Sequence, residues 1–209
     1  FYYLHSEQLH LDNIMQGSTY QEVPAKATGN DNFTSWPNRN DWYETIKLNY
    51  GIDIISGRHV HFCPTPDTWQ KMLQILLYWA SKGIDGFRCD MAEMVPVEFW
   101  EWALPQVKTA YPNIVFIAEV YNPNEYRNYI YNGKFDYLYD KVGLYDTLRG
   151  VMCGYTSARQ ITACWQSVDD IKTHMLNFLE NHDEQRIASD FFAKYPEKGK
   201  AGLIVSACM

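Results

Sequence analysis

Short apolar segments that each end at or near an acidic residue recur along the chain and constrain its fold most strongly. Residues 84–90 (IDGFRCD), 114–119 (IVFIAE), 135–140 (FDYLYD) and 175–180 (MLNFLE) have the length and composition of strands. Stretches with helical spacing of apolar residues alternate with them. Strands that alternate with helices form parallel sheets covered on both faces, which explains their uniformly apolar character. The sequence therefore predicts an α/β fold.

Local signals place the boundaries of the helices. Thr65 and Pro66 suit a helix start, apolar residues recur at helical spacing after them, and Gly83 suits the end. A second helical stretch covers residues 97–103, and Pro105 is expected to open a separate short helical piece because proline breaks the hydrogen-bond ladder.

The acids at the predicted strand ends favour one kind of α/β architecture. Asp90, Glu119, Asp140 and Asp183 follow successive strands. In a (β/α)8 barrel the carboxyl ends of the strands surround one mouth, so these acids would meet there. An open doubly wound sheet is the competing arrangement, but no glycine-rich phosphate-binding motif follows any strand. The barrel is the preferred prediction.

The first 60 residues differ in texture from the rest. They are rich in Asn, Gly, Ser, Thr and Asp and show little apolar periodicity, as in residues 29–38 (GNDNFTSWPN). We therefore predict two parts, a loop-rich subdomain over residues 1–60 and a partial barrel over residues 61–209.

Charge and cysteine content exclude several classes of partner. The chain has 18 Lys plus Arg against 25 Asp plus Glu, a net charge of -7, which argues against binding a nucleic-acid backbone. No apolar run is long enough to predict a membrane span. Five cysteines without a CxxC pair indicate neither a disulfide framework nor a thiolate zinc site, and the cellular compartment stays unknown.

Three segments taken together resemble the catalytic motifs of the alpha-amylase family, glycoside hydrolase family 13. They are residues 86–90 (GFRCD), 116–120 (FIAEV) and 178–184 (FLENHDE), and the resemblance extends back to Asp41. It implies a (β/α)8 TIM barrel of which this chain holds about strands four to seven, preceded by an incomplete version of the family's inserted domain B. It also implies cleavage of α-1,4-glucosidic bonds of starch or maltooligosaccharides with retention of configuration.

The resemblance assigns a role to each carboxylate. Retaining cleavage requires a carboxylate nucleophile and a carboxylic acid that protonates the leaving oxygen. By motif match, Asp90 would be the nucleophile that forms a glycosyl-enzyme, and Glu119 the acid that later serves as base. Asp183 would be the third catalytic carboxylate, which binds sugar hydroxyls and stabilises the transition state.

Neighbouring residues would bind the substrate or pack. Arg88 precedes Asp90 by two positions, so both side chains should lie on one face of the strand, where the cation keeps Asp90 ionised. His182 would donate a hydrogen bond to the sugar in the cleavage subsite. Cys89 should point to the opposite face and pack there. The aromatic candidates for stacking on sugar rings are Trp36, Trp42 and Tyr121.

Other acids near the strand ends have a simpler interpretation. Glu93, Asp140 and Glu184 are expected to be helix caps or solvated loop carboxylates. Lys47, Glu93 and Met94 stand where many alpha-amylases have residues that bind calcium or outer sugars, and a Lys ammonium repels a cation. We therefore predict no cofactor and no metal ligands, with the family's usual calcium site absent.

Alternative functions remain open at this point. An alpha-glucan transglycosylase or glucosyl isomerase would use the same carboxylates, because the choice of acceptor depends on the shape of the subsites and on water exclusion. A glucan-binding homologue without catalysis is less consistent with an intact set of motif residues. A metal-dependent hydrolase lacks the paired-histidine spacing of a metal site.

The length of the chain sets a further expectation. A complete barrel needs about 250 residues, and the chain has 209 of which about 60 are loop-rich. The family pattern places the first three strands before Phe1 and the eighth after Met209. We expect the isolated chain to be inactive or nearly so, because half a barrel leaves the sugar subsite incomplete.

Overall fold

The computed structural model describes residues 2–30 and 32–209 of the chain. These residues form two compact units, Phe1–Trp79 and Ala80–Met209, and each unit is described by itself.

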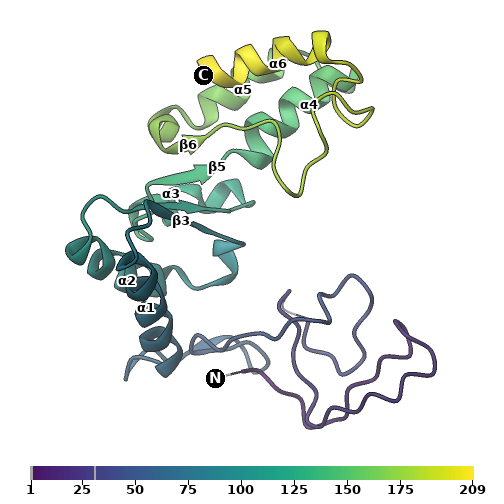
Figure 1. Cartoon of the computed structure of the whole chain (residues 1–209), viewed down its shortest axis with the longest axis vertical. Helices are drawn as coiled ribbons and strands as arrows, with labels where there is room; N and C mark the ends of the chain where they lie inside the picture. Colours follow the sequence, from purple (N-terminus) through teal and green to yellow (C-terminus); the bar gives the residue numbers. More distant parts are fainter. Residues whose placement is uncertain (1, 31) are drawn as a thin grey trace. The chain divides into compact units, whose positions relative to one another are not determined.

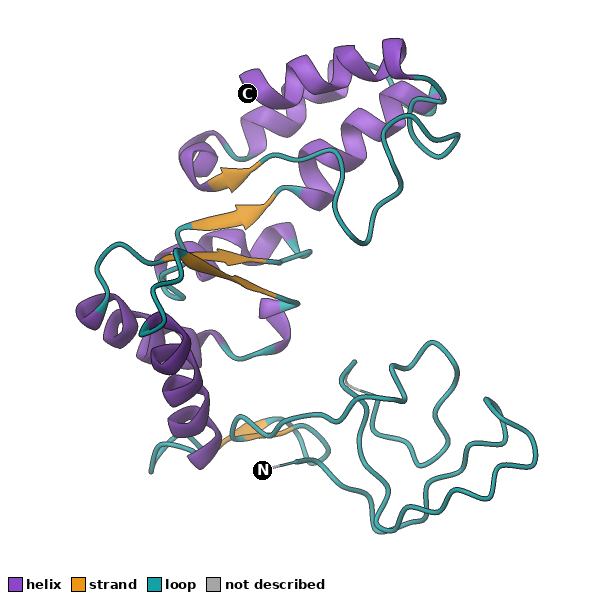
Figure 2. Cartoon of the chain, viewed as in Figure 1, coloured by secondary structure: helices purple, strands orange, loops and turns teal. Residues whose placement is uncertain are grey.

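The first unit consists mainly of loops (Figure 2), and it ends at Trp79, whereas the sequence predicts the boundary after residue 60. Its regular elements are a short antiparallel pair, β1 (Ile52–Asp53) and β2 (His59–Val60), followed by helix α1 (Asp67–Ala80). Backbone hydrogen bonds hold the loops together around the buried Ala25 and Ala27. The indole Nε1 of the buried Trp69 donates to the carbonyl oxygen of Tyr50 at 2.9 Å, which ties α1 to the loop before β1.

The second unit is built on a parallel four-stranded sheet in the order β3-β4-β5-β6 (Figure 1). Register aligns Cys89 with Ala118, Ala118 with Leu138, and Leu138 with Met175. The parallel sheet with intervening helices confirms the predicted α/β class. Its strands are β3 (Gly86–Cys89), β4 (Val115–Ala118), β5 (Tyr137–Tyr139) and β6 (Met175–Leu176).

Helix α2 (Val97–Ala110) runs without interruption through Pro105, so the predicted break at this residue is wrong. The missing amide of Pro105 leaves the carbonyl of Glu101 without its helical partner, and Glu101 is solvent-exposed. Side-chain bonds support this turn: Gln106 donates to the carbonyl of Trp102, and Thr109 to that of Pro105, both at 2.7 Å. Burial of the other face of α2, which includes Phe99, Ala103 and Val107, keeps the helix continuous.

The last predicted strand is much shorter than residues 175–180. Asn177 leaves the sheet and donates to the Ser206 carbonyl at 3.3 Å, and Glu180 accepts from the backbone N–H of Ile187 at 2.7 Å. These polar side chains stabilise a loop that continues to residue 195. The other elements of the unit are η1 (Ala92–Met94), η2 (Pro123–Glu125), α3 (Tyr126–Tyr131), η3 (Lys141–Tyr145), α4 (Asp146–Cys153), α5 (Arg159–Ser167), η4 (Asp169–His174) and α6 (Pro196–Cys208).

Two apolar clusters hold the sheet and its helices. Around Phe135, which is 2% exposed, aromatic rings from α2, β4 and α3 meet: Trp100 at 5.0 Å, Phe116 at 6.5 Å and Tyr129 at 6.3 Å between centroids. The second cluster joins η3 and α4 to the loop after β6, and its buried members are Leu144, Tyr145, Leu148, Met152, Leu179, Phe192 and Ala193.

Substitution of Phe135 tests the first cluster. Phe135→Ala removes a ring that three aromatic neighbours surround, so the free energy of unfolding should fall by about 3–5 kcal/mol. Urea denaturation followed by tryptophan fluorescence measures this. Tyr155→Ala, at a side chain that is 80% exposed, is the control and should change stability by less than about 0.5 kcal/mol. Equal losses in the two variants would contradict the assignment of Phe135 to the core.

Candidate active site

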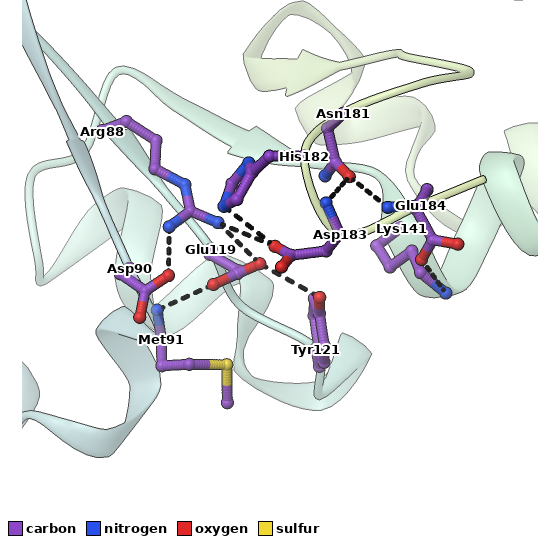
Figure 3. A network of polar contacts seen from close by, with 10 residues as sticks. All are labelled: Arg88, Asp90, Met91, Glu119, Tyr121, Lys141, Asn181, His182, Asp183 and Glu184. Carbon is purple, nitrogen blue, oxygen red and sulfur yellow. Dashed lines mark hydrogen bonds and ion pairs between the residues drawn. The ribbon is translucent and has the colours of Figure 1, made fainter. Parts of the chain in front are cut away.

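The site lies at the carboxyl edge of the sheet, where β3, β4 and the loop after β6 meet (Figure 3). Because Cys89 pairs with Ala118, the next residues, Asp90 and Glu119, come at the same level of the sheet. The backbone N–H of Glu119 donates to the carbonyl of Cys89 at 3.0 Å, which extends the register past the strand ends. The parallel pairing thus brings two acids distant in sequence side by side.

Arg88 contacts all three carboxylates predicted from the motifs. Its Nη1 hydrogen-bonds Asp90, and its Nη2 lies 2.8 Å from Glu119 Oε1 and 3.9 Å from Asp183 Oδ2. The guanidinium also lies 5.6 Å from the centroid of the Tyr139 ring. Burial opposes its charged form, but the hydrogen bond to Asp90 and the charge of Glu119 outweigh this and raise the pKa of Arg88. One permanent cation is therefore shared by three acids.

Glu119 is the buried member of the group. Its side chain is 3% exposed, against 69% for Asp90. Besides the ion pair with Arg88, it accepts hydrogen bonds from the Tyr121 hydroxyl at 3.0 Å and from the backbone N–H of Met91 at 2.9 Å. Burial and the neighbouring Glu119 raise the pKa of Tyr121, so its hydroxyl stays a donor at neutral pH. Contacts on both oxygens fix the orientation of the Glu119 carboxyl group.

His182 and Asp183 come from the loop after β6. His182 Nε2 lies 3.1 Å from Asp183 Oδ2, and the two side chains are 65% and 53% exposed. The side-chain oxygen of Asn181 accepts the backbone N–H groups of Asp183 and Glu184 at 2.9 and 2.8 Å. Asparagine favours such turns because its side chain can bond the backbone two residues on. The structure thus brings all five predicted site residues together.

The remaining acids separate into different roles. Asp140 is buried and caps η3 by accepting from the backbone N–H of Leu144 at 2.9 Å, in line with the helix-cap interpretation. Glu93 accepts from the backbone N–H of Asn122 at 3.1 Å. Glu184 differs from the expectation of a solvated carboxylate, because its side chain is only 13% exposed and is paired with Lys141 at 3.1 Å.

Some contacts of the site have weak sequence signals. Met91 has a left-handed backbone (φ 40°), which orients its N–H toward Glu119 and is unfavourable for a residue with a side chain. Nothing in the local sequence predicts that conformation. Tyr121 lies two residues after Glu119, a spacing that places both on one side of an extended segment, and Asn181 precedes the His-Asp pair as a turn former.

The other sugar-stacking candidates, Trp36 and Trp42, belong to the first unit and are 46% and 39% exposed. Lys47 is buried in the same unit, and its ammonium is unsuited to a calcium site. Residues 2–30 and 32–209 contain no group of three or more His, Cys, Asp or Glu side chains that could hold a metal ion. Every helix in this described part is too short or too polar to cross a membrane.

Comparison with known proteins identifies the family. The family model for the alpha-amylase catalytic domain matches residues 62–207. The chain therefore belongs to the alpha-amylase family.

Curated relatives match shorter segments. An alpha-1,4-glucan:maltose-1-phosphate maltosyltransferase of Cereibacter sphaeroides is 34% identical over 71 residues, which is 33% of this chain and 11% of that protein. The protein of the same name from Picrophilus torridus is 40% identical over 53 residues, 25% of this chain and 8% of that protein. The matched segments thus span about a tenth of these relatives.

Solved structures confirm the barrel assignment. An alpha-amylase from Lactobacillus plantarum superposes with a TM-score of 0.57 at 28% identity, covering 79% of this chain and 39% of that one. A cyclic alpha-maltosyl-(1→6)-maltose hydrolase from Arthrobacter globiformis has a TM-score of 0.58 at 22% identity, covering 66% and 32%. The chain thus has the fold of part of the alpha-amylase (β/α)8 barrel.

The thiol beside the site provides a test of its packing. Cys89 is buried, and burial raises its pKa to about 12. Only the thiolate reacts with iodoacetamide, so at pH 8 a raised pKa lowers the rate, by about 10³-fold relative to an ordinary thiol. Mass spectrometry of the native chain should show labelling of the exposed Cys63 and Cys208 and none of Cys89, and in urea all should react. Equal labelling rates for Cys89 and Cys63 would contradict the buried position.

Proposed function

We propose that this chain carries the catalytic centre of a retaining glycosidase that cleaves α-1,4-glucosidic bonds of starch or maltooligosaccharides. The observation that supports it is the meeting of Asp90, Glu119 and Asp183 around Arg88 at the carboxyl edge of a parallel sheet. Membership of the alpha-amylase family supports the substrate class.

The proposed chemistry uses two carboxylates in two successive steps. Asp90, exposed at the edge, attacks the anomeric carbon while Glu119 gives a proton to the leaving oxygen, so the glycosidic bond breaks as the bond to Asp90 forms. Glu119 then takes a proton from water, whose oxygen attacks the anomeric carbon and releases Asp90. Two successive inversions give net retention.

The other residues act on charge and orientation. Arg88 compensates the negative charge of Asp90 before its attack, and that of Glu119 once it has given up its proton. Asp183 accepts hydrogen bonds from sugar hydroxyls and stabilises the positive charge that develops on the sugar ring, and His182 donates to a hydroxyl in the same subsite. Tyr121 and the Met91 N–H hold Glu119 in place.

The curated relatives favour a second candidate, glucan transfer. Those proteins are named alpha-1,4-glucan:maltose-1-phosphate maltosyltransferases. A transferase would pass the glycosyl unit from Asp90 to a sugar hydroxyl instead of water, with the same carboxylates.

Proton NMR of maltoheptaose separates these functions. The assay uses the protein translated from the complete reading frame, with Asp90→Asn as the test variant and Asp169→Asn, a surface acid paired with Lys172, as the matched control. Shorter products that form first as the α anomer are expected, with a loss of at least about 10³-fold in Asp90→Asn and none in Asp169→Asn.

Other products would change the conclusion. Longer chains, or turnover only when maltose 1-phosphate is supplied as donor, would establish transfer. Initial β-anomeric products would exclude retention. The 209-residue chain assayed alone tests the expectation that it turns over little or no glucan.

A further inference from the structure

We propose that Lys141 is a positioning residue for Asp183 and acts through Glu184. The inference rests on the proposed glycosidase function, in which Asp183 is the third catalytic carboxylate.

Asp183 is weakly held by its own contacts. It lies in the segment between β6 and α6, where residues 177–195 form neither helix nor strand. Leu179 and Phe192 are apolar residues of this segment that are buried toward its two ends. Residues 181–184, called the tip below, lie between them. The Asp183 carboxylate is half exposed and 3.9 Å from Arg88, the outer limit of an ion pair. His182, 3.1 Å from Asp183, belongs to the same tip, and the hydrogen bond from the Ile187 N–H to Glu180 joins two residues of the same loop. A contact with another element must therefore fix the tip if Asp183 is to hold a defined position.

Glu184 makes the contacts that fix the tip. Asn181 accepts the backbone N–H groups of both Asp183 and Glu184, so these residues belong to one turn. Their side chains diverge: Asp183 is directed toward Arg88 and His182, and Glu184 toward Lys141 (Figure 3). A shift of Glu184 therefore moves Asp183.

The partners of Glu184 are firmly placed in the core. Lys141 Nζ lies 3.1 Å from Glu184 and 2.8 Å from Asp146, and 4.9 Å from the centroid of the Tyr145 ring. The hydroxyl of the buried Tyr145 donates to Glu184 at 2.8 Å. Charge-assisted hydrogen bonds that are mostly shielded from water are stronger than surface pairs. These contacts tie the tip to η3 and to the start of α4.

Loss of the contact between Lys141 and Glu184 is expected to slow the chemical step. If Asp183 stabilises the transition state more than the bound substrate, a looser tip lowers kcat and leaves KM nearly unchanged. Displacement of a catalytic group by about 1 Å can cost about 10²-fold in rate. In the protein translated from the complete reading frame, we therefore expect Lys141→Met to lower kcat on maltoheptaose about 10- to 100-fold and to change KM less than about threefold.

The variants include a matched control and a rescue. Lys172 also pairs with a carboxylate, Asp169 at 2.8 Å, and lies 5.1 Å from an aromatic ring centroid, that of Trp165, so Lys172→Met removes a similar set of contacts outside the site. Lys172→Met should leave kcat unchanged, and Lys141→Arg should restore most of it. Lys141→Met and Glu184→Gln together should cost no more than the worse single variant, because both break one link.

Three kinetic outcomes would overturn the proposal: unchanged kcat in Lys141→Met, a loss that appears only as a higher KM, or additive losses in the double variant. A higher KM alone would make Lys141 a substrate-binding residue instead.

Amide hydrogen exchange tests the tether independently of activity. Residues 181–184 should exchange at least about tenfold faster in Lys141→Met than in wild type, while residues 115–118 of β4 stay protected. If wild-type protein does not cleave maltoheptaose, the proposed function fails, and the exchange experiment still decides whether Lys141 holds the tip. Unchanged exchange at residues 181–184 would refute the tether.

Discussion

The shared contact of Arg88 with three carboxylates is the interaction on which the site depends. Two unit charges of like sign 4 Å apart repel by about 4 kcal/mol near a protein surface, and the buried Glu119 has little water to solvate it. One cation among the acids offsets both costs. Arg88 can reach them because it lies on β3, next to β4, which Glu119 directly follows, and near the loop that carries Asp183. The register of the sheet therefore matters for the electrostatics of the site as well as for packing, because it brings Arg88 next to the carboxylates.

The carboxylates differ in how they are supported. Asp90 and Glu119 directly follow paired strands, and backbone hydrogen bonds of Glu119 to Cys89 and Ala92 fix its position relative to the sheet. Asp183 lies at the tip of a long loop, where side-chain contacts take the place of backbone hydrogen bonds between strands. Loops of this kind open more easily than sheet strands. Precision at Asp183 thus depends on polar links such as that between Glu184 and Lys141.

The sequence predicted correctly those elements for which local residue preferences and tertiary packing favour the same structure. The apolar segments at β3 and β4 are strands, and Arg88 and Asp90 share a face because side chains alternate along a strand. The predicted break at Pro105 and the long last strand were wrong. In the first case, burial of the opposite face of α2 outweighed the lost hydrogen bond. In the second, Asn177 and Glu180 found partners outside the sheet. Both outcomes depend on distant neighbours.

The sequence alone determined the α/β class, because the apolar segments alternate with helical ones, and the resemblance of its motifs to those of the alpha-amylase family identified the five residues that meet at the site. Tertiary structure decided what those residues contact. The contacts of Arg88 with Glu119 and Asp183, the hydrogen bond from the left-handed Met91 to Glu119 and the pairing of Glu184 with Lys141 join positions that are 28 to 95 residues apart. Such contacts arise only when strand register and helix packing bring those segments together, because no local preference of the chain encodes a distance between them.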